Sequence, residues 1–414
     1  MRRNGISRRT LLAAVPAAWA IGARGSRADT PAAPAAAPAA PATIRIGYIR
    51  IRSSERQTTI SLLDQPTPDA GLAGAKLAVD DDNTTGRFTN QVFELTDQVI
   101  HAGDDPTAAY NALVGQGVRL ILLDLPAAAV LKLADLGRAQ GVLFFNVSSP
   151  DDALRQADCR GNVINVAPSR AMLADAVGQY LVWKRWTRWF LVYGSHPDDA
   201  ALAAAYRRTA KRYGAKIVEE RVFKDTGGSR QTDSGLVQIQ QQIPVFTQNA
   251  PDYDVLIAAD ENEVFAGYLP YRTWDPRPVA GSAGLRPETW DPSSEAWGGT
   301  QVQNRFNRLF HRGMKSLDMQ AWTAGRMIGE AASRAATADP AKIAAYIKSP
   351  AFGVAAYKGQ RLTLRDWDWQ LRQPILLSDG RTVVSISPQK GFLHQVTELD
   401  TLGYDRPETK CSQH

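Results

Sequence analysis

The strongest constraint on the fold is a repeated alternation of short apolar runs with amphipathic stretches. Residues 44–51 alternate β-type side chains, and residues 71–82 follow with helical spacing until Asn83-Thr84-Thr85-Gly86 ends them. The pattern continues with predicted strands at 91–97, 119–125 and 142–147 and predicted helices at 105–116 and 127–140. Short apolar strands joined by amphipathic helices predict an α/β fold with a mainly parallel sheet flanked by helices on both faces.

A second series of strands and helices begins beyond Cys159. The predicted strands are 163–167, 189–193, 216–222, 254–259 and 279–282, and the predicted helices are 170–185, 198–213, 301–313, 317–336 and 340–349. Residues 362–387 read as a hairpin centred on Ser378-Asp379-Gly380. The roughly 370 residues after Thr43 exceed what one core usually serves. We therefore expect two lobes: residues 44–165 plus about 284–352, and residues 166–283 plus about 353–414.

The N-terminus has the layout of a twin-arginine export signal. Ser7-Arg8-Arg9-Thr10 precedes an apolar run at 11–22, which is too short to span a bilayer, and Ser26-Arg27-Ala28 suits cleavage after Ala28. A structural amphipathic helix or an uncleaved anchor is the alternative. Residues 29–43 are almost entirely Ala and Pro, as in a linker. We expect a mature protein that acts in the periplasm.

Removal of residues 1–28 changes the charge balance. The chain has 48 Lys and Arg against 42 Asp and Glu, but this segment contains six arginines and no acid. The mature chain is therefore balanced, which argues against nucleic acid as a partner. Nothing after residue 28 is long and apolar enough to be a membrane span, so we do not expect a membrane-embedded protein.

The chain has two cysteines, Cys159 and Cys411. In an oxidising compartment they allow one disulfide, which would tie the end of the chain to its middle. Two unpaired thiols remain the alternative.

No catalytic constellation is present in the sequence. A phosphate-binding G-x-x-x-x-G-K-[ST] loop, H-E-x-x-H and C-x-x-C are all missing, and Gly281-Ser282-Ala283-Gly284 lacks the first glycine of a nucleophile elbow. The five histidines do not have metal-ligand spacing, and Asp80-Asp81-Asp82 point in different directions on a helix. We expect no enzyme activity, no catalytic cofactor and no metal.

Several motifs resemble those of one known family. Residues 74–83, then Asp104-Asp105-Pro106 and Gly117-Val118-Arg119-Leu120-Ile121, are similar to type I periplasmic solute-binding proteins of the branched-chain-amino-acid branch, the leucine-binding-protein-like group. The resemblance implies a two-lobed receptor with three crossing segments that delivers a solute to an ABC transporter permease, as a monomer. It also implies a ligand at the carboxyl ends of the strands, where helix N-termini favour anions.

A finer resemblance lies near the C-terminus. Tyr357-Lys358-Gly359-Gln360, residues 365–368, residues 370–375 and residues 399–404 resemble the subgroup associated with catabolism that depends on pyrroloquinoline quinone (PQQ). This implies PQQ, a planar tricarboxylate, as the ligand. The alternatives are a receptor for an amino acid or a small product of alcohol catabolism, or a PQQ sensor or chaperone for periplasmic dehydrogenases.

Loops after the first strands contribute candidate ligand residues. Leu125-Pro126-Ala127-Ala128-Ala129 lacks the hydroxyls that amino-acid-binding relatives use there, which argues against an ordinary amino-acid ligand. Ser148 and Ser149 read equally as a ligand loop or a helix N-cap. Arg50 and Arg52 share a strand face and either contact the ligand or are solvated.

Aromatic and arginine side chains gather between Tyr268 and Trp297, on a stretch with several prolines. Tryptophans could stack on a flat ligand while guanidinium groups fork onto its carboxylates. Packing is the alternative for each tryptophan. The complete set of expected ligand-binding residues is Arg50, Arg52, Ser148, Ser149, Arg272, Trp274, Arg286, Trp290 and Trp297.

Overall fold

A computed structural model describes residues 40–52, 67–225 and 239–412. The predicted signal at 1–28 and most of the predicted linker lie outside these ranges. The linker prediction extends too far by two residues, because Ala42 and Thr43 already belong to the first strand and pair with Gln91 and Val92.

The first sheet is wholly parallel, as the alternation predicted. Its strand order is β2-β1-β3-β4-β5. The strands are β1 (Ala42–Ile51), β2 (Gln91–Ile100), β3 (Leu120–Asp124), β4 (Leu143–Asn146) and β5 (Val163–Asn165).

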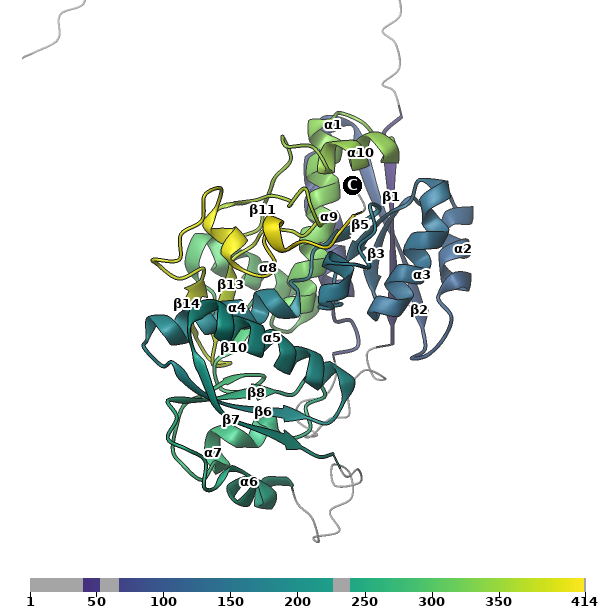
Figure 1. The fold of residues 1–414 in the computed structure, drawn as a ribbon. Helices are drawn as coiled ribbons and strands as arrows, with labels where there is room; N and C mark the ends of the chain where they lie inside the picture. The colour runs from purple at the N-terminus through teal and green to yellow at the C-terminus, as the bar shows by residue number, and fades with distance from the viewer. Residues whose placement is uncertain (1–39, 53–66, 226–238, 413–414) are drawn as a thin grey trace, which may run out of the picture. The chain divides into compact units, whose positions relative to one another are not determined.

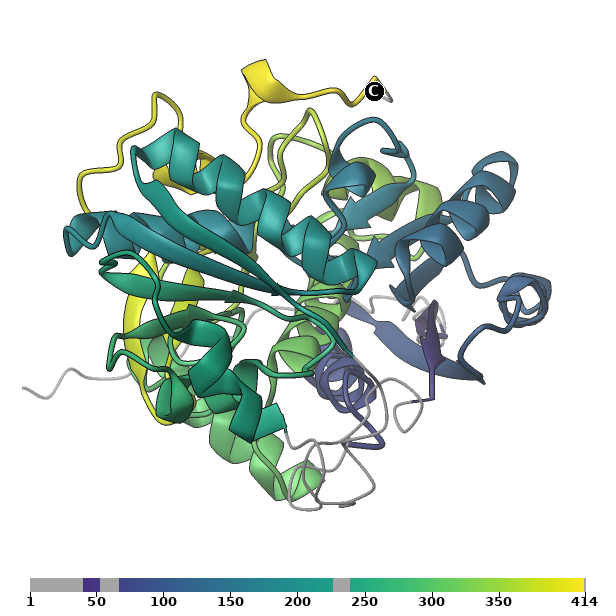
Figure 2. The ribbon, with the colours of Figure 1, turned by 60° about the horizontal axis from the view of Figure 1, so that its bottom comes forward.

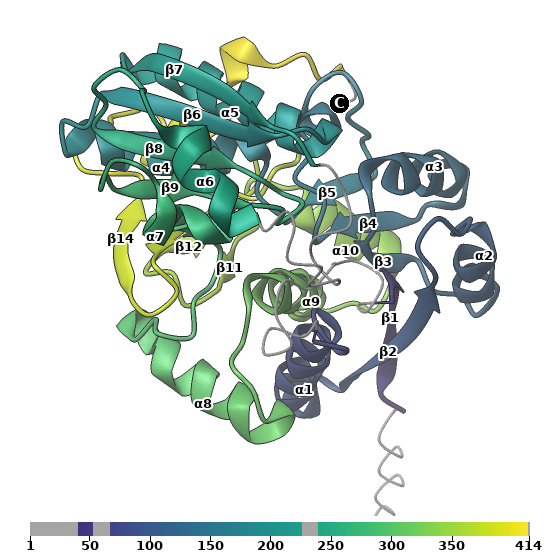
Figure 3. The ribbon, with the colours of Figure 1, turned by 90° about the horizontal axis from the view of Figure 1, so that it is seen from below.

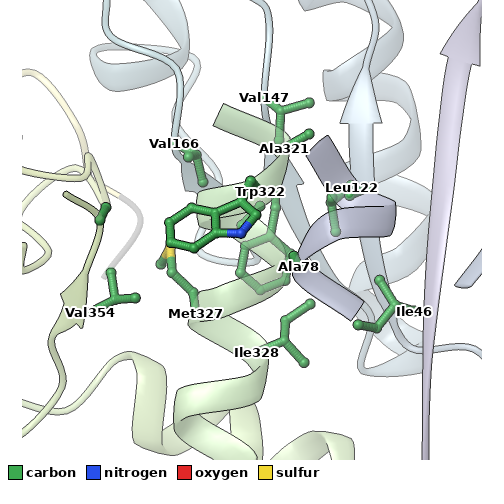
Figure 4. Packing of buried hydrophobic residues seen from close by; sticks show 14 of the residues in the cluster. Ile46, Ala78, Leu122, Val147, Val166, Ala321, Trp322, Met327, Ile328 and Val354 are labelled. Carbon is green, nitrogen blue, oxygen red and sulfur yellow. The ribbon is translucent and has the colours of Figure 1, made fainter. Parts of the chain in front are cut away.

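Helices cover both faces of this sheet (Figures 1 and 3). On one face, Ile44, Ile46 and Tyr48 pack with α1 (Leu72–Thr89) and α9 (Ser316–Arg334). On the other, Ile49 and Ile51 pack with α2 (Thr107–Gly115) and α3 (Ala127–Gly137). The odd and even residues of β1 therefore serve two different cores, as expected of a strand buried on both sides. Figure 4 shows the first of these cores around the Trp322 indole of α9.

The second sheet is also parallel, with strand order β7-β6-β8-β9. Helices α4 and α5 pack on one face, and α6 and α7 pack on the other (Figure 2). The strands are β6 (Arg188–Gly194), β7 (Lys216–Phe223), β8 (Val255–Ala259) and β9 (Val279–Gly281). The helices are α4 (Arg170–Trp183), α5 (Pro197–Tyr213), α6 (Ile239–Thr247) and α7 (Leu269–Arg272).

A small antiparallel sheet, β10-β13-β14, packs against α4. It contains β10 (Arg286–Glu288), β13 (Ile375–Ser378) and β14 (Val383–Ser387). The predicted hairpin is thus confirmed at its centre, but its arms are shorter than 362–387 because residues 363–374 turn around buried Arg365 and Gln370.

The remaining helices and strands lie in the second half of the chain. They are α8 (Gly299–Phe310), α10 (Pro340–Ile347), β11 (Val354–Ala355) and β12 (Arg361–Leu362). Short 3-10 helices are Arg138–Gln140, Asp152–Arg155, Ala266–Tyr268, Ala296–Gly298, Glu398–Thr401 and Arg406–Glu408. The division into lobes stays a prediction. Two observations bear on it: β10 pairs with β13, and Phe352, Leu362 and Leu371 pack in the core of the first sheet.

Cys159 and Cys411 are joined by a disulfide, with their Cα atoms 5.5 Å apart. Among the described residues, no helix is both long and apolar enough to cross a membrane. The same ranges contain no group of three or more His, Cys, Asp or Glu side chains that could hold a metal ion.

Candidate ligand-binding site

Arg170, the first residue of α4, joins loops that follow strands of both parallel sheets. Its Nε and Nη2 atoms each lie 2.7 Å from a carboxylate oxygen of Glu261, in the loop after β8. Its Nη1 donates to Asp151, in the loop after β4, at 2.8 Å, and Nη2 also donates to Asp198 of α5 at 3.1 Å. Since ligands of open parallel sheets bind beyond the carboxyl ends of the strands, this junction marks the candidate site.

The charges at this junction are strongly coupled. Arg170 is only 3% exposed. Burial alone would lower the pKa of Arg170, but Glu261 and Asp151 outweigh it and hold that pKa above its usual value. Burial raises the pKa of Glu261 even though Arg170 acts against the rise. Bidentate, charge-assisted bonds of this kind fix geometry as well as energy, so Arg170 holds Glu261 in one orientation.

The loop after β8 is shaped by two further carboxylates. Asp260 accepts hydrogen bonds from the backbone N–H groups of Val264, Phe265 and Ala266 at 2.7 to 2.9 Å. Asp199, buried in the first turn of α5, accepts the N–H of Glu261 at 2.8 Å. The loop therefore folds around Asp260, and Glu261 is left at the strand end.

A pocket of about 230 Å³ opens at the ends of β8 and β9. Arg286 contributes the one lining cation; its side chain is 43% exposed, and its Nε is 4.0 Å from Glu288. Burial raises the pKa of Glu288, which accepts a hydrogen bond from Ser316 at 2.6 Å. The other lining residues are Leu173, Leu202, Tyr206, Asp260, Glu261, Glu263, Gly281, Ser282 and Pro287. We call this the strand-end pocket.

Arg50 lies at the carboxyl end of β1, but its guanidinium has local partners. Nε and Nη2 each donate to Asp97 of β2 at 3.0 Å, and Nη1 donates to the Pro68 carbonyl at 3.2 Å. This bidentate pair leaves Arg50 as a brace between β1 and β2. Arg52 is exposed one residue beyond β1, and its backbone N–H donates to Ile100.

Ser148 and Ser149 form a turn after β4 that Asn146 organises. The Asn146 Oδ1 accepts both backbone N–H groups, at 3.3 and 2.9 Å. Ser149 is buried with its hydroxyl 3.4 Å from Asp151, whereas Ser148 is partly exposed. The structure thus places Ser148 and Ser149 in the same loop as Asp151, next to Arg170.

The aromatic and arginine segment does not converge on one site. Arg286 lines the strand-end pocket, whereas Trp290 is 2% exposed, packs in the core of the first sheet and donates to Gln303. Arg272 ends α7, and exposed Trp274 follows it, on the face of the second sheet opposite α4 and α5. Trp297 is exposed and borders a different pocket.

The physical reason is that this segment is not one irregular loop. It contains α7, β9 and β10, which belong to different layers and turn their side chains in different directions. The expectation of one shared stacking site is therefore corrected to four separate locations.

Sequence reasoning missed the residues that organise the junction. Glu261 lies two residues beyond a strand that was predicted to end at residue 259, so the strand-end rule could have nominated it. Arg170 carried no such signal, because its partners come from two loops and from the first turn of α5. Arg155 is also buried in this region and donates to Gln370 and to the carbonyls of Ser149, Asp151 and Ala167.

Comparison with known proteins gave a family match over most of the chain. The profile of the family described as "Periplasmic binding protein" matches residues 44–376. A search of curated proteins found no significant match.

Solved structures with the same fold include a branched-chain amino acid ABC transporter periplasmic ligand-binding protein from Burkholderia xenovorans. It has 17% identity and a TM-score of 0.64, covering 87% of this chain and 94% of that chain. An ABC transporter substrate-binding protein from Sphaerobacter thermophilus has 18% identity and a TM-score of 0.65, covering 83% and 97%. A solute-binding protein from R. palustris in complex with benzoate has 11% identity and a TM-score of 0.63, covering 89% and 99%.

Proposed function

The chain belongs to the periplasmic binding protein family, and from this membership we propose that it is the solute receptor of an ABC transporter. The observation that carries the proposal is the junction at Arg170, where loops after β4 and β8 meet. A solute that contacts the loops at the carboxyl ends of both parallel sheets binds best when these two sheet edges face each other. It thereby shifts an open–closed equilibrium toward the form that docks on the permease.

We propose a planar aromatic polycarboxylate as the solute, with PQQ as the first ligand to test. Two lines support this class. The residues 357–360, 365–368 and 370–375 resemble the PQQ-associated subgroup, and the R. palustris protein of the same fold binds benzoate, an aromatic carboxylate. At the strand-end pocket, Arg286 is the side chain able to fork onto a carboxylate.

A second candidate is a small solute that carries an amino group. The strand-end pocket is lined by four carboxylates, Asp260, Glu261, Glu263 and Glu288, against the single guanidinium of Arg286. Arg170 pairs with Glu261, but the lining still holds more carboxylates than guanidinium groups, which favours an ammonium group on the solute. A volume of about 230 Å³ suits a small molecule. Of the alternatives, an amino acid or a small product of alcohol catabolism, the amino acid has this chemistry.

The receptor proposal includes the place and partners of the protein. We propose that residues 1–28 direct twin-arginine export to the periplasm, and that the mature chain acts as a monomer with an ABC permease and without a catalytic cofactor. A sensor or chaperone for periplasmic dehydrogenases is the alternative for a PQQ-binding protein. Exchange of Arg8 and Arg9 for lysine should leave precursor in the cytoplasm, which fractionation and immunoblotting would show. Export of that variant at the normal level would contradict the twin-arginine proposal.

The discriminating experiment is a calorimetric titration of refolded, ligand-free mature protein with PQQ, leucine and benzoate. PQQ binding that weakens about tenfold in Arg286→Ala would support the polycarboxylate proposal, since a charge-assisted contact is lost. The matched control is Arg277→Ala, an exposed arginine just before the amino end of β9, which pairs with Asp252. Heat from leucine but not PQQ, abolished by Glu261→Gln, would favour the second candidate.

A further inference from the structure

We infer that a second pocket, beside Trp297 and residues 353–361, binds a planar aromatic polycarboxylate independently of the strand-end pocket. The pocket has a volume of about 760 Å³ and is bordered by residues of α8, α9, β11 and β12. The two pockets share no lining residue. The inference goes beyond the receptor function, because it requires neither transport nor closure.

Trp297 is an exposed indole held in a fixed place. Its φ of 51° and the φ of 54° at Tyr357 lie in the left-handed region, which is costly for bulky side chains. A Cβ atom on Gly359 would overlap the Trp297 ring, and one on Gly298 would come within 3.3 Å of the Tyr357 ring. The Trp297 ring thus lies against Gly359, and the Tyr357 ring lies against Gly298. This mutual packing restricts the position of the Trp297 ring although 54% of the residue is exposed.

The aromatic wall continues into the core of the molecule. The Tyr357 ring lies 5.4 Å from the Trp322 ring, measured between centroids. Trp322 is 2% exposed, packs among Ala78, Met327 and Val166 (Figure 4), and donates its indole N–H to Asp81 at 2.9 Å. A ligand that stacks on this wall would therefore meet a surface that is already rigid.

Cationic side chains dominate the charges of this pocket. Its lining includes Arg305, Arg326, Arg334, Lys358 and Arg361, against the carboxylates of Asp81 and Glu330. Asp81 forms a bidentate pair with Arg305 at 2.7 and 2.9 Å, and Glu330 pairs with Arg334 at 2.8 Å. These two pairs balance the two acids and leave Arg326, Lys358 and Arg361.

The partners of these three cations differ in charge. Arg326 pairs with Asp82, whose pKa is raised by burial to about 8. Arg361 donates to the neutral carbonyl of Ala351 at 2.6 Å. Lys358 donates to the amide oxygen of Gln373 and the carbonyl of Pro374, and burial lowers its pKa to about 7.

Five cationic side chains against two carboxylates, beside a rigid aromatic wall, define the ligand class. Guanidinium groups pair bidentately with carboxylates, and an indole stacks on a flat conjugated ring. A flexible, non-aromatic acid of the same charge would gain the ion pairs but not the stacking. The volume lies in the range of small-molecule sites. The geometry therefore suits an aromatic ring that carries two or three carboxylates.

The test is calorimetry of the mature protein with benzene-1,3,5-tricarboxylate, with citrate as the non-aromatic comparison of equal charge. We expect saturable binding of the aromatic acid, tighter than that of citrate and weakened by added salt. Arg361→Gln and Trp297→Ala should each lower its affinity about tenfold. Arg308→Gln, an exposed arginine on the same helix as Arg305, is the matched control and should change nothing.

The outcomes separate this inference from the proposed receptor function. Absence of aromatic tricarboxylate binding, or binding lost in Arg286→Ala but intact in Trp297→Ala, would overturn the second pocket. The receptor proposal would survive the latter result. Tricarboxylate binding that depends on Trp297 and Arg361, with no solute bound at the strand-end pocket, would support the second pocket. The same result would argue against the proposal that the strand-end pocket binds the solute. Unchanged circular dichroism would show that the exposed-residue variants are folded.

Discussion

At Arg170, one buried guanidinium meets two carboxylates from loops and one from the first turn of α5. Removing it would leave Glu261 and Asp151 without their strongest partner in a partly desolvated place, and such losses cost several kcal/mol. The interaction joins the loop after β4 of the first sheet to the loop after β8 of the second. It therefore orders the candidate site as well as stabilising the fold.

We predict that Arg170→Met lowers the free energy of unfolding by about 3 kcal/mol. Urea denaturation followed by circular dichroism would measure the change. Arg87→Met, at an exposed arginine in the last turn of α1, should alter stability by less than about 0.5 kcal/mol. Equal effects of the two substitutions would show that the Arg170 network is not stabilising.

Asp82 provides a pH-dependent prediction at the residue scale. It lies 1% exposed between α1 and α9, facing Arg326, Asp81 and Glu330, and burial raises its pKa to about 8. Between its unfolded value near 4 and about pH 8, the folded state holds more protons than the unfolded state. Stability therefore falls as pH rises through this window.

We predict that Asp82→Asn removes this component and makes the protein more stable than wild type at pH 8, by about 1 to 3 kcal/mol. At pH 5 the two proteins should differ less, because Asp82 is protonated in the folded state at that pH. Denaturant unfolding at both pH values measures the difference. A variant whose disadvantage grows with pH would mean that Asp82 is ionised in the folded protein.

At the scale of elements, α1 and α9 pack so closely that they use glycines at their contact. A Cβ atom on Gly74 of α1 would overlap the carbonyl of Asp318 on α9, and one on Gly325 would come 2.6 Å from Ala78. Asp318 also accepts the N–H of Gly71 at 2.8 Å, which anchors the start of α1. This pair of helices packs on one face of the first sheet.

We predict that Gly74→Ala destabilises the protein by about 1 to 3 kcal/mol, because backbone must move to admit the methyl group. The matched control is Gly115→Ala in the last turn of α2, where no heavy atom lies within 4 Å of the new Cβ. That change should be neutral or slightly stabilising, since alanine favours helix. Thermal or urea unfolding of both variants would test the pair, and equal stability would refute close packing at Gly74.

The elements were predictable where a simple periodicity applied. Residues 44–51 and 119–125 read as strands because both of their faces are buried, and α4 and α5 began within one residue of their predicted starts. The short helix at Ile239–Thr247, which contains Pro244, and the very short strands β10 and β11 were missed. The candidate site was less predictable. Arg50 and Ser149 were placed at the correct strand ends, but only the fold reveals that the Arg50 guanidinium is paired with Asp97 and that Trp290 lies in the core.

At the scale of the whole molecule, the Cys159–Cys411 disulfide closes a loop of 252 residues in sequence. Cys159 precedes β5 of the first sheet, and Cys411 lies in the C-terminal segment after the last short helix. In this segment the backbone N–H of Lys410 donates to the Gln156 side chain at 2.8 Å. Residues 399–404 pack against the helices of the second sheet, where Gly403 accepts from Arg208 and donates to Asp175. The crosslink therefore connects a loop of the first sheet with a tail that is anchored on α4 and α5.

Because a crosslink across so many residues restricts the unfolded chain, Cys411→Ser should lower the free energy of unfolding by about 3 to 5 kcal/mol. Reduction of the wild-type protein should give the same loss of unfolding free energy, whereas the serine variant should not respond to reductant.

If the C-terminal tail docks through Asp175 and Arg365 independently of the disulfide, ligand affinity at the strand-end pocket should change little in the variant. Urea unfolding with and without dithiothreitol, paired with calorimetry, measures both quantities. A reductant-insensitive wild type would contradict the predicted contribution of the disulfide, and a large loss of affinity would show that the tail sets the geometry of the distant loops.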